Sequence, residues 1–205
     1  MTTSVLNLVK LPQMAQRVFS RGVSIPPRKD VLWRIEHGVV RTITWSEEGT
    51  VIPLGYWGPG DVVGHPLSRL SPYQIECLTR TKMSILPKPL WYQASDAIVL
   101  HIQQAEELLN IVHLNPVSLR LWQFLVWLGD RFGRDVDQGR LIDLGLTQQE
   151  LAEAIGATRV TVTRLLGQYE SEGKLERYQR QLLLCSNQGM TALRGHQGRC
   201  RVIAI

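Results

Sequence analysis

Residues 146–175, LTQQELAEAIGATRVTVTRLLGQYESEGKL, predict two adjacent helices joined by a sharp turn. Thr147 and Glu150 have the T-x-x-E spacing of a capping box, in which each side chain bonds the backbone amide of the other residue, so a helix should begin here. Gly156 is expected at the turn, because glycine adopts left-handed backbone conformations without a clash at Cβ. A second helix should follow from about Thr158.

The spacing of small and apolar residues indicates a helix-turn-helix. A small residue, Ala152, stands where the two helices would touch, Gly156 follows four residues later, and the β-branched Val162 comes six residues after that. The inner faces of the two helices would then carry Leu151, Ala152, Ile155, Val162, Leu165 and Leu166.

The outer face of the second helix carries side chains suited to reading DNA. Arg159, Val160, Thr163 and Arg164 are spaced i, i+1, i+4 and i+5, so they project from one side. An arginine fork matches the O6 and N7 acceptors of guanine, a valine packs against a thymine methyl, and threonine hydroxyls bind phosphates. An ordinary solvated face is the alternative, but β-branched residues are mediocre helix formers and are not expected there for propensity alone.

A wing is predicted after the second helix. Residues 174–185, KLERYQRQLLLC, read as two short strands around a turn near Gln179 and Arg180. Arg177 and Arg180 would then lie against the phosphate backbone, although surface arginines without a DNA contact are an equally good interpretation. The candidate DNA-binding residues are Gln148, Thr158, Arg159, Val160, Thr161, Thr163, Arg164, Arg177 and Arg180.

The charge distribution agrees with a polyanionic partner. The 205 residues carry a net charge of +5, and residues 156–205 alone hold eight Lys/Arg against three Asp/Glu. Such clustering attracts nucleic acid, although many solvated protein faces are basic as well. The composition, 44% hydrophobic and 20% charged, is that of a folded protein and argues against a wholly disordered chain or a coiled-coil rod.

Three features favour a cytoplasmic protein without a membrane partner. No uninterrupted apolar run approaches the ~20 residues of a membrane-spanning helix. The N-terminal residues lack the pattern of a secretory signal. Cys77, Cys185 and Cys200 form neither a disulfide framework nor a Cys-x-x-Cys motif, so we expect a reducing compartment.

The N-terminal half predicts a small antiparallel β-barrel. Residues 31–90 contain short runs of β-branched and aromatic residues, separated by turn signals such as those at 37–38 and 58–61. Strands at this spacing indicate a barrel or sandwich. Because the periodicity becomes helical near residue 96, the fold class expected for the whole chain is α+β.

Two central helices are expected next. In the first, apolar residues step by 4, 3, 4 and 3, the heptad seam by which one helix packs along another, so we predict a dimerisation helix. Packing of the seam on the chain's own barrel is the alternative. The seam comprises Ile98, Ile102, Ala105, Leu109 and Val112.

The second helix is expected over 116–131. Asn115 as N-cap and Pro116 in the first turn predict that it begins there and is buried, with an exposed loop following at 133–140.

The chain resembles the Crp/Fnr family of transcription regulators. The order of parts is similar over nearly the whole chain, and the specific similarity lies in residues 117–175. There, FLVWLGDRFG (124–133) and IGATRVTVTRLLG (155–167) look most like the nitrogen-control, NtcA-type members. The resemblance implies a cyclic-nucleotide-binding-like barrel at 1–95, central helices with the dimerisation helix at 96–133, and a winged helix-turn-helix at 134–205.

The function implied by the resemblance is sequence-specific DNA binding. A homodimer would insert helix 158–168 into the major groove of double-stranded DNA and act together with RNA polymerase. Arg159, Val160 and Arg164 would face bases, while Thr158 and Thr161 would hold phosphates. Most members have a glutamate where this chain has Val160, so the chain should lose the acceptor that reads cytosine and prefer a different half-site.

The barrel departs from the family pattern. Where cyclic-nucleotide-binding relatives have Gly-Glu and later Arg-Ser/Thr-Ala, this chain has Gly-His-Pro at 64–66 and Tyr-Gln-Ile at 73–75. The carboxylate for the ribose hydroxyl and the arginine for the cyclic phosphate are therefore missing. Clustered N-terminal cysteines for an iron–sulfur cluster are missing as well. We expect no cofactor and an atypical or absent small-molecule effector.

Two other classes of function are weighed against this one. A small barrel containing His37 and His65 would suit a metal-dependent, cupin-like enzyme, but no His-x-His pair with a nearby glutamate occurs in a strand. A protein-interaction module with a degenerate DNA-binding domain is the other class, and the arginines on the second helix argue against it. We therefore expect neither enzymatic activity nor a metal site.

Overall fold

The N-terminal part consists of two antiparallel sheets packed face to face. The computed structural model describes residues 15–186. The expected units at 1–95 and 134–205 therefore extend beyond the described residues, at 1–14 and at 187–205. Among the described residues these two sheets share no backbone ladder, so the expected antiparallel barrel or sandwich takes the form of two open sheets. In spatial order the first sheet is β1 (Gln16–Phe19), β7 (Thr81–Pro87), β2 (Val31–His37) and β5 (Val62–Val63), and the second is β4 (Val51–Trp57), β3 (Val40–Trp45) and β6 (Gln74–Cys77).

Large apolar side chains fill the space between these sheets. Trp33 and Ile35 come from the first sheet, Trp57 and Ile75 from the second, and all four are buried. Successive strand residues point to opposite faces, so the alternation in the sequence delivers every second side chain to this core. Two short 3₁₀ helices, η1 (His65–Leu67) and η2 (Lys88–Ala94), connect the strands with each other and with the helices.

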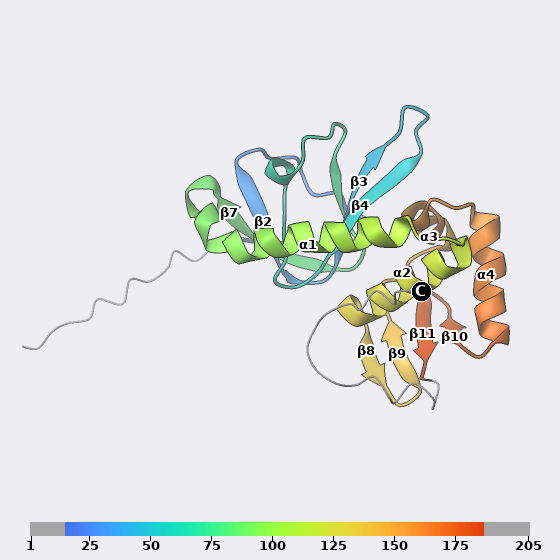
Figure 1. The fold of residues 1–205 in the computed structure, drawn as a ribbon. Helices are drawn as coiled ribbons and strands as arrows, with labels where there is room; N and C mark the ends of the chain where they lie inside the picture. Colours follow the sequence, from blue (N-terminus) through green and yellow to red (C-terminus); the bar gives the residue numbers. More distant parts are fainter. Residues whose placement is uncertain (1–14, 187–205) are drawn as a thin grey trace, which may run out of the picture.

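Two helices lead from the sheets to the C-terminal part. Helix α1 (Ser95–Val112) runs along the N-terminal sheets, and α2 (Val117–Phe132) lies beneath its far end (Figure 1). The second helix is where the sequence predicted it, but Asn115 is not its N-cap. Pro116 occupies that position without a side-chain cap, and Asn115 Nδ2 instead donates to the backbone oxygen of His113 at 3.4 Å.

The C-terminal part contains two further helices and a third antiparallel sheet. Helix α3 (Gln148–Ile155) lies between the N-terminal sheets and helix α4 (Arg159–Ser171), and α4 runs beside the third sheet (Figure 1). The prediction of a loop at 133–140 is wrong, because these residues form most of a hairpin. Its second strand pairs with β11, and its first strand forms the edge of the sheet. The spatial order is β10 (Leu175–Tyr178), β11 (Gln181–Cys185), β9 (Gly139–Ile142) and β8 (Arg134–Val136).

One hydrophobic core crosses the boundary between the two parts. Tyr56 of β4, together with Val39 and Leu78 at the ends of neighbouring strands, belongs to the same buried cluster as the inner faces of α2, α3 and α4. The helix-turn-helix is therefore seated on the N-terminal sheets as well as on α2. In the part of the chain that the structure describes, no helix is long and apolar enough to cross a membrane.

Candidate DNA-binding surface

The capping box predicted at the start of α3 is confirmed. The amide of Glu150 donates to Thr147 Oγ1 at 3.1 Å, and the amide of Thr147 donates to Glu150 Oε2 at 2.7 Å. Two amides that the helix leaves without partners are thereby satisfied, which fixes the first residue of the helix-turn-helix.

The turn between α3 and α4 is built as the sequence predicted. Gly156 has φ 61° and ψ 45°, the left-handed conformation that favours glycine. The next amide, that of Ala157, donates back to the carbonyl of Ala152 at 2.9 Å. Thr158 then caps α4, because its Oγ1 accepts from the amide of Thr161 at 3.2 Å.

The inner face of α4 is anchored at both ends. Val162, Leu165 and Leu166 are buried, as expected from their spacing. Tyr169 is also buried and was missed in the sequence, where an aromatic residue late in the helix could be assigned to either face. Its hydroxyl donates to the backbone oxygen of Ser118 in α2, and burial raises the pKa of its phenol to about 12.

The outer face of α4 leaves the base-reading candidates free. Arg159, Val160 and Arg164 are all exposed, and Val160 is 78% exposed. Within residues 15–186, neither arginine has an ion-pair partner. Water solvates the two arginines well but not the apolar Val160 between them, and the combination suits base edges and phosphates.

The polar candidates near this face are partly engaged with each other. Thr163 Oγ1 lies 2.5 Å from Gln148 Oε1 and 2.9 Å from the backbone oxygen of Arg159. The hydroxyl therefore donates either to Gln148 of α3 or to a carbonyl of its own helix. Thr158 and Thr161 share a hydroxyl contact of 2.9 Å. A hydroxyl has one donor hydrogen and two acceptor lone pairs. The hydroxyls of Thr158 and Thr161 can therefore stabilise the start of α4 and still contact a phosphate.

The two wing arginines differ in their surroundings. Arg177 forms a two-pronged ion pair with Glu170 of α4, at 2.6 Å from Nε and 2.5 Å from Nη2. Arg180 is exposed in the turn between β10 and β11, next to Gln179 with φ 55°. The surroundings of Arg177 favour a structural role, and Arg180 is placed better for a phosphate.

The seam predicted on α1 divides between two faces. Ile98, Ala105 and Val112 pack against the chain's own buried clusters. Ile102 and Leu109 are 55% and 58% exposed, and Val99, which the sequence reading did not include, is exposed with them. The exposed apolar side chains on this side of α1 are therefore Val99, Ile102 and Leu109, of which the last two belong to the predicted seam.

The residues at the positions of the missing effector anchors, His65 and Tyr73, line a cavity of about 630 Å³. His65 is half-buried, and its ring lies 5.1 Å from that of Tyr73 in an edge-on contact. Trp57 lies against His101 of α1 with the rings 3.7 Å apart and nearly parallel, and its indole N–H donates to Thr42 Oγ1 at 3.1 Å. Among the described residues, no group of three His, Cys, Asp or Glu side chains could hold a metal ion.

Comparison with known proteins places the C-terminal part among DNA-binding domains. The sequence profile of the Crp-like helix-turn-helix domain matches residues 119–193. The regulatory protein CysR of Synechococcus elongatus is 40% identical over 176 residues, which cover 84% of this chain and 85% of that protein. A global nitrogen regulator of Synechocystis is 47% identical over 66 residues, covering 32% of this chain and 29% of its own length.

Solved structures show the same fold over most of the chain. A CRP-family transcriptional regulator from Thermus thermophilus superimposes with a TM-score of 0.73 at 21% identity, covering 83% of this chain and 92% of that one. FixK2 from Bradyrhizobium japonicum gives a TM-score of 0.69 at 18% identity, covering 83% and 92% of the two chains.

Proposed function

Because this chain belongs to the Crp/Fnr family of transcription regulators, we propose that it reads a two-fold symmetric DNA site as a homodimer, with one α4 helix of each subunit in the major groove. Its curated relatives are regulators, so the cupin-like enzyme is not favoured. The observation that carries the proposal is the outer face of α4, where Arg159, Val160 and Arg164 are exposed together.

Each candidate residue is assigned a role by its position on this face. Arg159, Val160 and Arg164 reach base edges, and the hydroxyls of Thr158 and Thr161 at the helix start bind phosphates. Thr163 and Gln148 hold α4 against α3 through their mutual contact. Arg180 reaches the backbone from the wing, and Arg177 keeps the wing on α4.

Dimerisation is assigned to the exposed stripe of α1. Val99, Ile102 and Leu109 lie on one side of an 18-residue helix, long enough for two copies to pack side by side. Two helix-turn-helix units then face successive turns of one groove, roughly 34 Å apart.

The remaining assignments follow from the same family. We infer a sensor-like unit at 1–95, central helices at 96–133 and a DNA-binding unit at 134–205, in a cytoplasmic protein that contacts RNA polymerase. The sensor-like unit uses an effector other than a cyclic nucleotide, or none, because His65 and Tyr73 stand at the positions of the charged anchors and pack against each other.

Selection of bound duplexes from a random DNA pool tests the proposal. The expected result is an inverted repeat whose half-sites are about one helical turn apart, bound by one dimer. Selection of unrelated sequences with equal affinity, or binding by a monomer to a single asymmetric site, would contradict it.

A further inference from the structure

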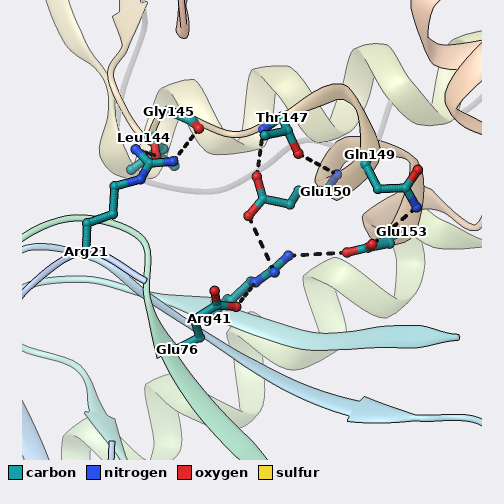
Figure 2. A network of polar contacts seen from close by, with 9 residues as sticks. All are labelled: Arg21, Arg41, Glu76, Leu144, Gly145, Thr147, Gln149, Glu150 and Glu153. Atoms are coloured by element: carbon teal, nitrogen blue, oxygen red, sulfur yellow. Dashed lines mark hydrogen bonds and ion pairs between the residues drawn. The ribbon is translucent and has the colours of Figure 1, made fainter. Parts of the chain in front are cut away.

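One buried arginine joins the N-terminal sheets to the helix-turn-helix. Arg41 lies on β3, is buried, and extends toward α3 between three carboxylates (Figure 2). Its Nε is 2.8 Å from Glu76 Oε2, its Nη2 is 3.4 Å from Glu150 Oε1, and its Nη1 is 3.4 Å from Glu153 Oε2. Glu76 belongs to β6, directly opposite Arg41, whereas the other two glutamates belong to α3.

Both α3 carboxylates also hold groups of their own helix. Glu150 offers Oε1 to Arg41 and Oε2 to the amide of Thr147, so one carboxylate serves the arginine and the capping box together. Glu153 likewise offers Oε2 to Arg41 and Oε1 to Gln149 Nε2, which lies 3.2 Å away. The start of α3 is thus built around the arginine of another part of the molecule.

The charge balance makes this contact sensitive to the loss of Arg41. A single guanidinium stands among three carboxylates, and all four side chains are shielded from water, with exposures of 8%, 22%, 17% and 13% for Arg41, Glu76, Glu150 and Glu153. Removing the cation would leave like charges facing each other across the junction. They would separate by moving α3 away from the sheet.

A second arginine holds the segment that precedes α3. Arg21 Nη2 donates to the backbone oxygen of Gly145 at 2.5 Å, and Nη1 donates to that of Leu144 at 3.3 Å (Figure 2). Gly145 has φ +62°, and a Cβ added there would lie 1.9 Å from Arg21 Nη1, so the guanidinium occupies the space that a side chain would need.

Whatever holds α3 also holds α4. The two helices share a buried face, with Leu151 and Ile155 of α3 in the same core as Val162 and Leu165 of α4. Their outer edges are joined by the contact between Thr163 and Gln148. The helix-turn-helix therefore moves as a unit, and its orientation is set at the junction with the sheets.

We propose that Arg41 is a positioning residue for DNA binding. By holding α3 on the N-terminal sheets, it fixes the direction of α4 relative to α1, and thereby the separation of the two α4 helices in the dimer. This inference rests on the proposed reading of a two-fold site. Without Arg41, each helix-turn-helix still recognises a half-site, but the pair is no longer pre-organised for one spacing.

The experiment compares two variants that change the charge in opposite directions. Arg41→Met removes a cation, and Glu153→Gln removes an anion. Asp143→Asn removes an anion at an exposed aspartate in the same segment and is the charge control for Glu153→Gln. Each dimer is titrated with the duplex selected by the wild-type protein, with the same duplex lengthened by about five base pairs (half a turn) between half-sites, and with random DNA.

Arg41→Met is expected to lose affinity for the selected spacing by about tenfold or more while binding the lengthened duplex nearly as well as the selected one. Glu153→Gln removes one of the two α3 ion pairs of Arg41 and is expected to show a smaller loss of the same kind. A general charge effect would instead shift all three duplexes together, and in opposite directions for the two variants. Unchanged spacing selectivity in both variants would overturn the inference, whereas failure of the wild-type protein to select any two-fold site would overturn the proposed function.

Circular dichroism and sedimentation confirm that each variant is folded and dimeric before it is titrated. If Arg41→Met does not fold, the double variant Glu150→Gln, Glu153→Gln decides the question, because it removes both α3 ion pairs of Arg41 while a glutamine at position 150 still suits the capping box. Spacing selectivity equal to that of Asp143→Asn would then reject the role of Arg41.

Discussion

The hydroxyl of Tyr169 donates to the backbone oxygen of Ser118 at 2.5 Å and ties the last turns of α4 to the start of α2. The ring of Tyr169 also packs edge-on against that of Trp122, with centroids 5.3 Å apart. The helix proposed to read DNA is thus anchored on its inner side by an aromatic residue that faces away from the bases.

Replacing this tyrosine should affect stability and leave recognition intact. Tyr169→Phe keeps the ring packing and removes one hydrogen bond, so we expect a loss of about 1 kcal/mol in the free energy of unfolding. Urea unfolding followed by circular dichroism measures the loss, and relative affinities for selected and random duplexes should stay as in the wild type. An altered sequence preference with unchanged stability would mean that Tyr169 acts on recognition.

Charge on the exposed stripe of α1 should yield monomers. Leu109 is 58% exposed in the single chain, so Leu109→Glu leaves the fold intact while placing two carboxylates against each other in the dimer. Sedimentation velocity is expected to show monomers that bind the selected duplex weakly. Leu70→Glu, at a leucine outside α1 that is 51% exposed, is the matched control and should remain dimeric. A dimeric Leu109→Glu protein with unchanged DNA affinity would place the interface elsewhere.

Cyclic nucleotides should leave DNA binding unchanged. The positions of the ribose and phosphate anchors hold His65 and Tyr73, and Trp57 is packed against His101 between the sheets and α1. Isothermal titration calorimetry with cyclic AMP and cyclic GMP is expected to give no saturable heat, and either compound should leave the affinity for the selected duplex within error. Micromolar binding accompanied by tighter DNA binding would contradict this prediction.

The local parts of the helix-turn-helix could be predicted from the sequence because short-range chemistry determines them. The capping box of Thr147 and Glu150, the left-handed Gly156 and the cap at Thr158 each involve residues within a few positions of one another. The exposed and buried faces of α4 followed from helical periodicity, which acts over the same range.

The long-range contacts could not be read in this way. Arg41 and Glu153 are 112 residues apart, and an arginine in a strand gives no sign of its distant partner. Only part of the seam predicted on α1 is exposed in the single chain, because Ile98 and Ile102 look alike in sequence while the neighbouring sheets cover only the first. The hairpin of β8 and β9 has a local ladder but was missed because its residues are typical of a loop, and its pairing with the distant β11 leaves no sign in the sequence.

Arg164 tests the central claim, because it lies one turn after Val160 on the outer face of α4 and has no ion-pair partner within the described residues. Arg180→Ala is the matched control: a phosphate contact has no base preference, so its loss should weaken all duplexes equally and reduce the salt slope by about one counterion per contact.

The decisive measurement is the affinity of Arg164→Ala for three DNAs at several salt concentrations. They are the selected duplex, the same duplex with the contacted guanine replaced by another base, and random DNA. We predict a loss of about 1–3 kcal/mol per half-site on the selected duplex alone, with relaxed selectivity at one symmetric base pair. Equal losses on all three duplexes, or no loss on any of them, would contradict the assignment of α4 as the helix that reads the bases.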